Sequence, residues 1–176
     1  MRTLRFLLLL ALCLATSGRS QTRPYCVPYR ELRVGGVTLG DRIATVPRRL
    51  GSPQRVDSTW SEAHGGGYRV LVYHYGELAI SFGRGRVEAV DVSDSTAATP
   101  SGVRVGLTLE EVGRRLSVDV RGLGSRTWEP PVCGESDVTI TGFRVTFSNP
   151  RGPFDPPPAV PVVRRVVSIH VEEYWP

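Results

Sequence analysis

Hydrophobic and polar residues alternate in two series of short stretches, with the period of two that is typical of β-strands. The strands predicted by the first series, which glycine turns separate, cover residues 68–75, 78–82 and 86–92, with a fourth candidate at 55–60. Those predicted by the second series cover residues 137–141, 143–147 and 165–171, with a fourth candidate at 123–128. We therefore expect two antiparallel meanders of three to four strands.

A stretch with helical periodicity precedes each meander. Apolar residues recur at i, i+3 and i+7 in both stretches, as Ile43, Val46 and Leu50 and as Leu109, Val112 and Leu116. Thr108 and Glu111 have the spacing of a capping box at the second helix. The features expected at the first helix are a cap at Asp41, a stop at Gly51 and a kink at Pro47 or a restart near Thr45.

One sequence motif occurs twice and contains both helical stretches. It is GVTLGDRIATVPRRLG at 36–51 and GVRVGLTLEEVGRRLS at 102–117, aligned without a gap. This repeat predicts an α+β fold of two tandem units, each a short helical segment packed on a three- to four-stranded antiparallel sheet. The expected segments are an N-terminal segment at 21–35, unit 1 at 36–98 and unit 2 at 99–176.

Residues 1–20 have the pattern of a signal peptide. Arg2 and Arg5 precede an apolar run at 6–15, and small residues follow it. No later stretch has the roughly 20 apolar residues of a membrane helix, so we expect an exported chain, periplasmic or secreted, without stable membrane insertion after signal cleavage. A lipid anchor at Cys13 is the alternative, but Leu12 before it is not the small residue that lipidation favours.

The basic residues are all arginine, 22 against 17 acidic residues. Three of the arginines lie in the expected signal peptide, so the net charge falls from +5 to +2 when it is removed. The remaining arginines are scattered along the chain. This composition predicts no nucleic-acid partner.

Two cysteines, Cys26 and Cys133, remain in the expected mature chain. In an oxidising compartment only one internal pairing is available to them. We expect a disulfide that closes a loop of about 100 residues and stabilises the fold by roughly 4 kcal/mol in the chain-entropy model.

A short motif resembles that of a known family. Gly106, Thr108, Glu111, Val112 and Leu116, followed by a tryptophan and a meander, resemble the outer-membrane assembly lipoproteins SmpA/OmlA, or BamE. Two such units in one exported chain are similar to the secreted beta-lactamase inhibitor protein family, whose tandem repeats place helices on antiparallel sheets. The resemblance implies this fold more than any function, and it assigns no inhibitory contact residue.

Two histidines raise the question of catalysis. His64 begins an HGGG string, which builds the oxyanion hole of some esterases, but no G-x-S-x-G nucleophile elbow accompanies it. His74 lies next to a predicted turn at Gly76. A small secreted hydrolase that uses His64 or His74 is therefore the alternative function.

A metal site would need several converging ligands, and the nearest candidates are Asp91, His170 and Glu172. His170 and Glu172 share one face of a predicted strand, and Asp91 is the repeat equivalent of His170. We expect Asp91 and His170 to lie in separate sheets and therefore predict a solvated polar face, with no metal and no cofactor.

A binding surface remains as the expected functional feature. The residues predicted to face away from the helices are Ala79, Ser81, Ala89 and Asp91 in unit 1 and Arg144, Thr146, Ser168 and His170 in unit 2. Trp60 and Trp128 are expected to fill the junction between the units. The candidate partner-binding residues are Tyr73, Tyr75, Arg144, Arg151, Phe154, His170, Tyr174 and Trp175. Together with the proline-rich loop at 148–165, they predict an exported, non-enzymatic protein that binds a protein or an envelope component.

Overall fold

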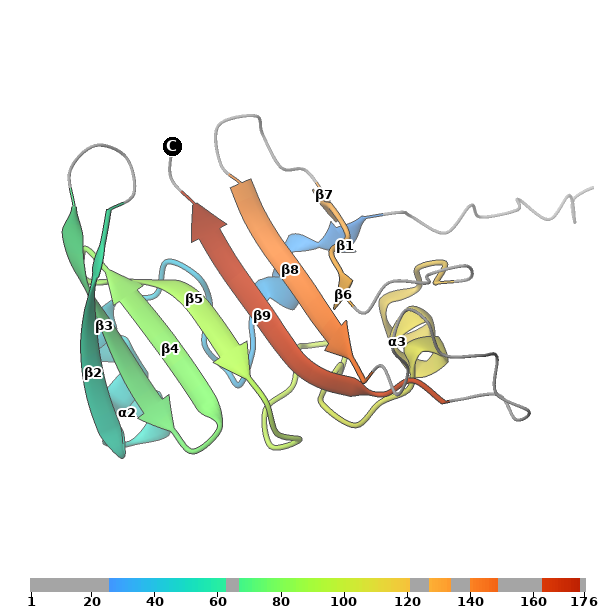
Figure 1. The fold of residues 1–176 in the computed structure, drawn as a ribbon, viewed down its shortest axis with the longest axis horizontal. Coiled ribbons are helices and arrows are strands. Elements are labelled where there is room, and N and C mark those ends of the chain that lie inside the picture. Colours follow the sequence, from blue (N-terminus) through green and yellow to red (C-terminus); the bar gives the residue numbers. More distant parts are fainter. Residues whose placement is uncertain (1–25, 63–66, 121–126, 134–139, 149–162, 175–176) are drawn as a thin grey trace, which may run out of the picture.

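The sheet is the central element of the computed structural model, which describes residues 26–62, 67–120, 127–133, 140–148 and 163–174. For residues 140–142 and 173–174 it describes the backbone only. The fold is α+β: the described residues form a seven-stranded antiparallel sheet, two short α-helices and a small parallel strand pair (Figure 1).

The first half of the chain forms four of these strands, as its alternation predicts. They are β2 (Arg55–Ser61), β3 (Tyr68–Tyr75), β4 (Leu78–Gly83) and β5 (Arg86–Val92). Tight turns join the last three strands. Gly76, Arg84 and Gly85 have positive φ angles there, which glycine adopts without strain. The GRGR segment around Arg84 is therefore a hairpin tip.

The second half contributes β6 (Thr127–Trp128), β8 (Ile140–Phe147) and β9 (Val166–Tyr174). The prediction of two strands at 137–141 and 143–147 is wrong over residues 140–147, which form one continuous strand. Gly142 is compatible with an extended backbone as well as with a turn, so the sequence did not distinguish the two cases. Residues 134–139 lie outside the described part of the chain.

The two meanders join into one sheet, whose strand order is β2-β3-β4-β5-β9-β8-β6. The expectation of separate sheets is therefore wrong. β5 and β9 pair antiparallel from Ala89–Glu172 to Val92–Ile169, side by side in the middle of Figure 1. Each strand has buried valine or isoleucine on the helix side, and pairing removes an exposed edge from both meanders.

The helices cover one face of the sheet. A 3-10 turn, η2 (Ile43–Thr45), leads into α2 (Val46–Leu50), which has Pro47 in its first turn and ends at Gly51 with a φ of 83°. The predicted restart near Thr45 and the stop at Gly51 are thus confirmed. Asp41 does not cap the helix; its carboxylate instead accepts hydrogen bonds from the Thr38 amide and the Arg49 side chain.

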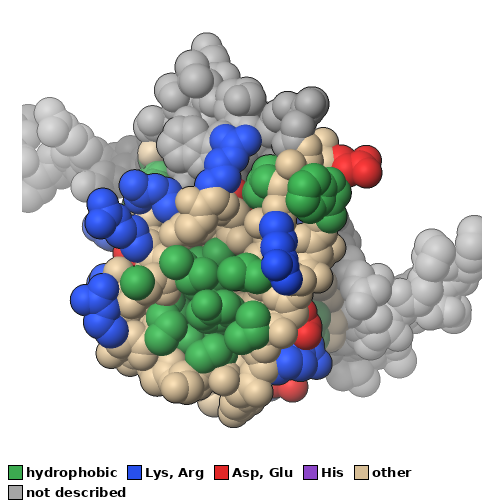
Figure 2. All heavy atoms as spheres, turned by 90° about the vertical axis from the view of Figure 1, so that its left-hand side faces the viewer, with side chains coloured by type: hydrophobic (Ala, Val, Ile, Leu, Met, Phe, Trp, Pro, Cys, Tyr) green, Lys and Arg blue, Asp and Glu red, His purple; other side chains and the backbone are tan. Residues whose placement is uncertain are grey.

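The second helix is longer and better capped. In α3 (Leu109–Leu116), Thr108 and Glu111 form the predicted capping box, and Leu109, Val112 and Leu116 are buried. The shorter α2 lies behind β3 and β4 (Figure 1). Hydrophobic side chains gather on the left-hand side of the molecule as drawn in Figure 1, with arginines around them (Figure 2).

The N-terminal segment closes the helix side of the fold. It forms β1 (Val27–Pro28) and the 3-10 helix η1 (Tyr29–Leu32), which contains Glu31. The Glu31 side chain is fully buried and accepts hydrogen bonds from Thr99 and Ser101, at distances of 2.7 to 3.1 Å. Because a buried carboxylate needs such partners, this contact fixes the linker between β5 and α3 against η1.

Candidate functional site

The face of the sheet opposite the helices carries a row of polar groups across six of its seven strands. Strand register places the members of this charged row side by side, in the order Arg55, His74, Ala79, Asp91, His170 and Arg144. Residues that pair directly across strands point to the same face. The predicted outward orientation of Ala79, Asp91, Arg144 and His170 is therefore confirmed.

Asp91, His170 and Glu172 form the centre of this face, where β5 meets β9. The ring nitrogens of His170 contact a carboxylate on each side, with Nδ1 2.5 Å from Asp91 Oδ1 and Nε2 3.0 Å from Glu172 Oε2. Burial by itself would lower the pKa of His170, but the hydrogen bonds and negative charges of Asp91 and Glu172 outweigh it and raise this pKa. The two carboxylates thus favour the charged form of the ring.

The same three residues do not converge on a metal site. The imidazole of His170 stands between the two carboxylates, so its nitrogens point away from each other and each is already paired. Within the described ranges, no group of three or more His, Cys, Asp or Glu residues could hold a metal ion. The arrangement is an ion-paired cluster.

Charged side chains extend this cluster toward the two edges of the sheet. Arg144 is paired with Glu129 and lies 3.8 Å from Glu172. On the other side of the face, Asp57 Oδ2 is 2.9 Å from the Arg55 guanidinium and 3.0 Å from His74 Nε2. The sequence analysis missed Arg55, Asp57 and Glu129, because only the register of the edge strands brings them to these histidine and arginine side chains.

A hollow of about 280 Å³ lies between the two charged groups. Ala79 separates His74 from Asp91 in the charged row, and its small side chain leaves this space open. The other residues that line the hollow are Gly76, Glu77, Val92, Ser93 and Ser168. Glu77 accepts a hydrogen bond of 2.7 Å from Ser93, and Asp91 contacts His170 through one oxygen. The remaining carboxylate oxygens of these two residues suit a cationic or hydrogen-bond-donating group.

A second polar cluster on the same face was also missed by the sequence analysis. The Tyr68 hydroxyl donates a hydrogen bond of 3.0 Å to Glu88, and the Arg84 guanidinium lies 5.1 Å from the Tyr68 ring centre. Gly83 makes room for it, because a Cβ there would lie 1.8 Å from Glu88 Oε1. Burial raises the pKa of Glu88, against the opposing effects of Tyr68 and Arg84.

The predicted partner-binding residues are distributed over different parts of the molecule. Arg144 and His170 lie on the open face, whereas Tyr73 and Tyr75 pack against the core on the helix side, where Tyr73 contacts the Phe82 ring edge-on at 4.8 Å. The structure thus corrects the placement of both tyrosines beside the open face. Several of the residues predicted to be functional fall outside the part of the chain that the structure describes. They are Arg151, Phe154, Trp175, His64, the side chain of Tyr174 and most of the 148–165 loop.

The two tryptophans differ, although the repeat places them at like positions. Trp128 is buried and packs edge-on against Phe143, with ring centres 6.5 Å apart. Trp60 is 63% exposed on β2, the free edge of the sheet. The prediction that both tryptophans fill a junction between units is wrong, because β5 and β9 form that junction, whereas Trp60 and Trp128 lie on the two edge strands of the sheet.

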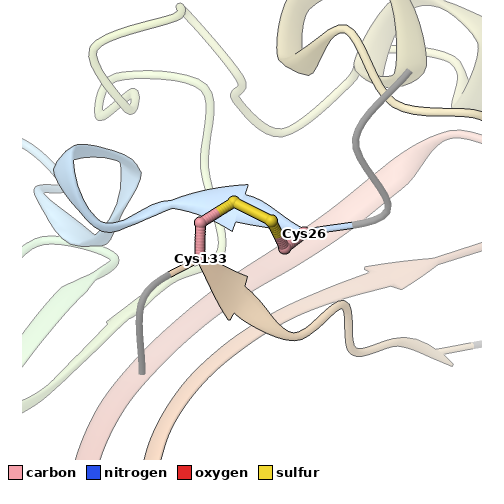
Figure 3. The surroundings of a disulfide bond; sticks show 2 residues. All are labelled: Cys26 and Cys133. Carbon is pink, nitrogen blue, oxygen red and sulfur yellow. A yellow bond between two sulfur atoms is a disulfide. The ribbon is translucent and has the colours of Figure 1, made fainter. Parts of the chain in front are cut away.

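The predicted disulfide is confirmed. Cys26 and Cys133 are bonded, with their Cα atoms 5.1 Å apart (Figure 3). The bond adjoins the parallel pair formed by β1 and β7 (Val132–Cys133), in which Val27 lies beside Val132. Disulfides persist in oxidising compartments, so this bond is consistent with export. None of the described helices is long and apolar enough to cross a membrane.

Comparison with known proteins gives structural likenesses alone. No family model and no curated protein matches the chain. One similar solved structure is that of the uncharacterized protein yfeY from Escherichia coli, with 20% identity, a TM-score of 0.46 and coverage of 84% of this chain and 99% of that one. The chain belongs to no family that these comparisons identify.

Two further structures belong to larger proteins. A cysteine-rich secretory protein (SAV1118) from Staphylococcus aureus has 14% identity and a TM-score of 0.46, with 84% of this chain and 50% of that one covered. An extracellular protein containing an SCP domain from Bacillus anthracis has 13% identity, a TM-score of 0.40 and coverage of 76% and 43%. The chain thus spans half or less of either protein, and these likenesses carry no functional argument.

The comparisons overturn the family prediction. The likeness found is to yfeY and to the two secreted proteins, not to BamE-like or beta-lactamase inhibitor-like repeats. The motif around Thr108 and Glu111 encodes a helix cap, which any helix of this kind can use. It was therefore too general to identify a family.

Proposed function

We propose that this chain is an exported, non-enzymatic protein that binds a protein or envelope partner through the open face of its sheet. The observation that carries the proposal is the charged row, which crosses the face and borders the hollow above Ala79. Charged groups at an interface favour partners with complementary charges and exclude others. A cationic side chain of a protein partner suits the hollow, since Glu77 and Asp91 line it.

The contacts of the two described histidines support a binding role rather than catalysis. A hydrolytic histidine activates a nucleophile, usually a hydroxyl or thiol within hydrogen-bond reach. His170 contacts Asp91 and Glu172, and His74 contacts Asp57 and Arg55. Both rings therefore engage charged groups. A small hydrolase that uses His64 or His74 stays the alternative, and turnover that His64→Ala or His74→Ala abolishes would favour it.

Capture from an envelope extract tests the binding face. Ala79→Arg places a long cationic side chain in the hollow and should abolish capture of the partner. Ala44→Arg is the matched control, because Ala44 is exposed but lies in η2, on the helix side. Partners are identified by mass spectrometry, and melting curves verify that both variants fold. Equal capture by the two variants would contradict the proposal.

The proline-rich loop is proposed as a second contact. Deletion of residues 149–160 should weaken capture without the complete loss expected from Ala79→Arg. Unchanged capture by the deletion variant would restrict the binding site to the open face.

A further inference from the structure

The two edges of the sheet differ in length and exposure. At one edge, β6 has two residues and Trp128 is buried. At the other edge, β2 has seven residues, of which six are exposed. An edge strand presents unpaired backbone donors and acceptors to any extended segment that approaches it. β2 is therefore the edge at which the sheet can be extended.

The side chains of β2 make this edge apolar on the helix side. Val56 is 51% exposed and Trp60 is 63% exposed, although both are large and hydrophobic. The register places Val56 beside Tyr73 and Trp60 beside Arg69, so Val56 continues the apolar face of β3, and the exposed Trp60 lies next to a charged residue. Figure 2 faces the side of the molecule on which β2 lies in Figure 1, and it shows hydrophobic side chains gathered there.

We propose that β2 pairs with β2 of a second copy of this chain, antiparallel and about a two-fold axis at Ser58. Val56 and Trp60 stand two residues to either side of Ser58. In this register each Val56 lies directly opposite the partner's Trp60, on the helix side of both sheets. An aromatic beside a β-branched residue is a favourable cross-strand pair.

The charges on β2 select this register. Centring the pair on Ser58 places Asp57 opposite Thr59 of the partner subunit and Arg55 opposite Ser61 of the partner subunit, so no like charges face each other. Directly opposite residues must point to the same face, so the axis must pass at a residue that faces its own copy. The nearest alternative registers therefore move the axis from Ser58 to one of its two neighbours. An axis at Asp57 would place the two Asp57 carboxylates opposite each other. An axis at Thr59 would place Val56 opposite Glu62 of the partner subunit.

A dimer of this kind has a consequence for the open face. The two-fold axis runs perpendicular to the sheet, so the two sheets become one and both open faces point the same way. The inference does not depend on the proposed function. If that function is correct, the dimer presents two binding faces to one partner surface.

The first test measures oligomeric state, by analytical ultracentrifugation of the mature, disulfide-bonded protein over a concentration series. The wild type should form a dimer, and Val56→Lys should raise its dissociation constant at least about tenfold, as for a central interface residue. Val163→Lys is the matched control, because Val163 is 57% exposed but precedes β9. A wild type that stays monomeric, or a dimer that both lysine variants affect equally, would overturn the proposal.

Cross-linking tests the register. Residues on the axis have Cα atoms within the range of about 7 Å that a disulfide allows, whereas neighbouring residues do not. Ser58→Cys should therefore give a disulfide-linked dimer on oxidation, and Thr59→Cys should give little. Cross-linking of Thr59→Cys instead, or of neither variant, would rule out an axis at Ser58.

Discussion

Asp91 and His170 lie directly opposite each other on β5 and β9, with a distance of 2.5 Å between Asp91 Oδ1 and His170 Nδ1. The sequence repeat makes these two residues equivalent to each other. Each occupies the sixth position of a matching strand segment, Arg86–Val92 or Arg165–Val171. If a pseudo-two-fold axis related the two repeated segments, it would pass between two equivalent residues that face each other, as Asp91 and His170 do. One equivalent is acidic and the other basic, so the pair attracts.

The first prediction concerns the pH dependence of stability. The pKa of His170 is raised above its ordinary value of 6.5, so folding favours the protonated ring. Its stabilising contribution is complete below about pH 6.5 and is lost as the pH rises through the raised pKa. The glutamine of His170→Gln cannot be protonated, so this variant should not show the fall in unfolding free energy above pH 6.5 that His170 causes in the wild type. Urea unfolding at a series of pH values measures the free energy of unfolding for both proteins.

A matched histidine variant separates this effect from general changes in stability. His74→Gln leaves His170 and both of its carboxylate partners in place, so the wild-type loss above pH 6.5 should persist. NMR titration of the His170 ring provides a direct measurement. A His170 pKa below 6.5 would contradict the assignment.

The sequence predicted those features that depend on local signals. The strand at 68–75 and the capping box at Thr108 agree with the structure, because alternation and cap residues act within a few positions. The pairing of β5 with β9 was missed, since no local signal specifies which two apolar strands meet. Tyr73 and Tyr75 were misplaced because both faces of residues 68–75 carry apolar side chains, which leaves the alternation ambiguous.

The second prediction concerns the disulfide. Cys26 and Cys133 are 107 residues apart in sequence, so their bond strongly restricts the unfolded chain. The chain-entropy model gives a loss of about 4 to 5 kcal/mol for the Cys26→Ser, Cys133→Ser double variant. Urea unfolding of the double variant and the oxidised wild type measures this loss. Reduced wild type should match the double variant, and a loss below about 1 kcal/mol would show that the loop constraint has little effect.

The third prediction concerns the buried carboxylate of Glu31. Its oxygens accept hydrogen bonds from the Thr99 hydroxyl and from the Ser101 amide and hydroxyl. Glu31→Ala leaves the buried Thr99 hydroxyl and the half-buried Ser101 donors without an acceptor and should cost about 3 kcal/mol of unfolding free energy. Arg30→Ala is the control: it removes the ion pair between Arg30 Nε and Glu31 Oε1, 3.4 Å apart, but leaves the Thr99 and Ser101 contacts in place. Because the Arg30 side chain is 74% exposed, this loss should be less than about 1 kcal/mol. Equal losses in the two variants would mean that the Thr99 and Ser101 contacts are unimportant.

The two copies of the repeated sequence motif, at 36–51 and 102–117, make matching contacts with the sheet. The backbone amides of Gly40 and Gly106 each donate a hydrogen bond of 2.8 Å to the last strand of their meander. The acceptors are the carbonyl oxygens of Val87 in β5 and Val166 in β9. Arg86 and Arg165 donate from their side chains to the carbonyl oxygens of the same two glycines, at 3.0 and 2.9 Å. The identical glycines therefore have a physical role, which is to connect the turn before each helix to the last strand of its meander.

The fourth prediction tests where the two copies differ. Thr108 caps α3, whereas the aligned residue in the first copy, Arg42, makes no side-chain cap at η2. Thr108→Ala should therefore lower the free energy of unfolding by about 1 kcal/mol, the usual effect of losing a helix N-cap. Arg42→Ala is the matched control and should change it by less than half as much, because no cap is lost. Thermal and urea unfolding provide the measurement. A larger loss from Arg42→Ala than from Thr108→Ala would contradict the prediction, because the backbone β-bridges at Arg42 and Thr108 are present in both copies and neither substitution removes them.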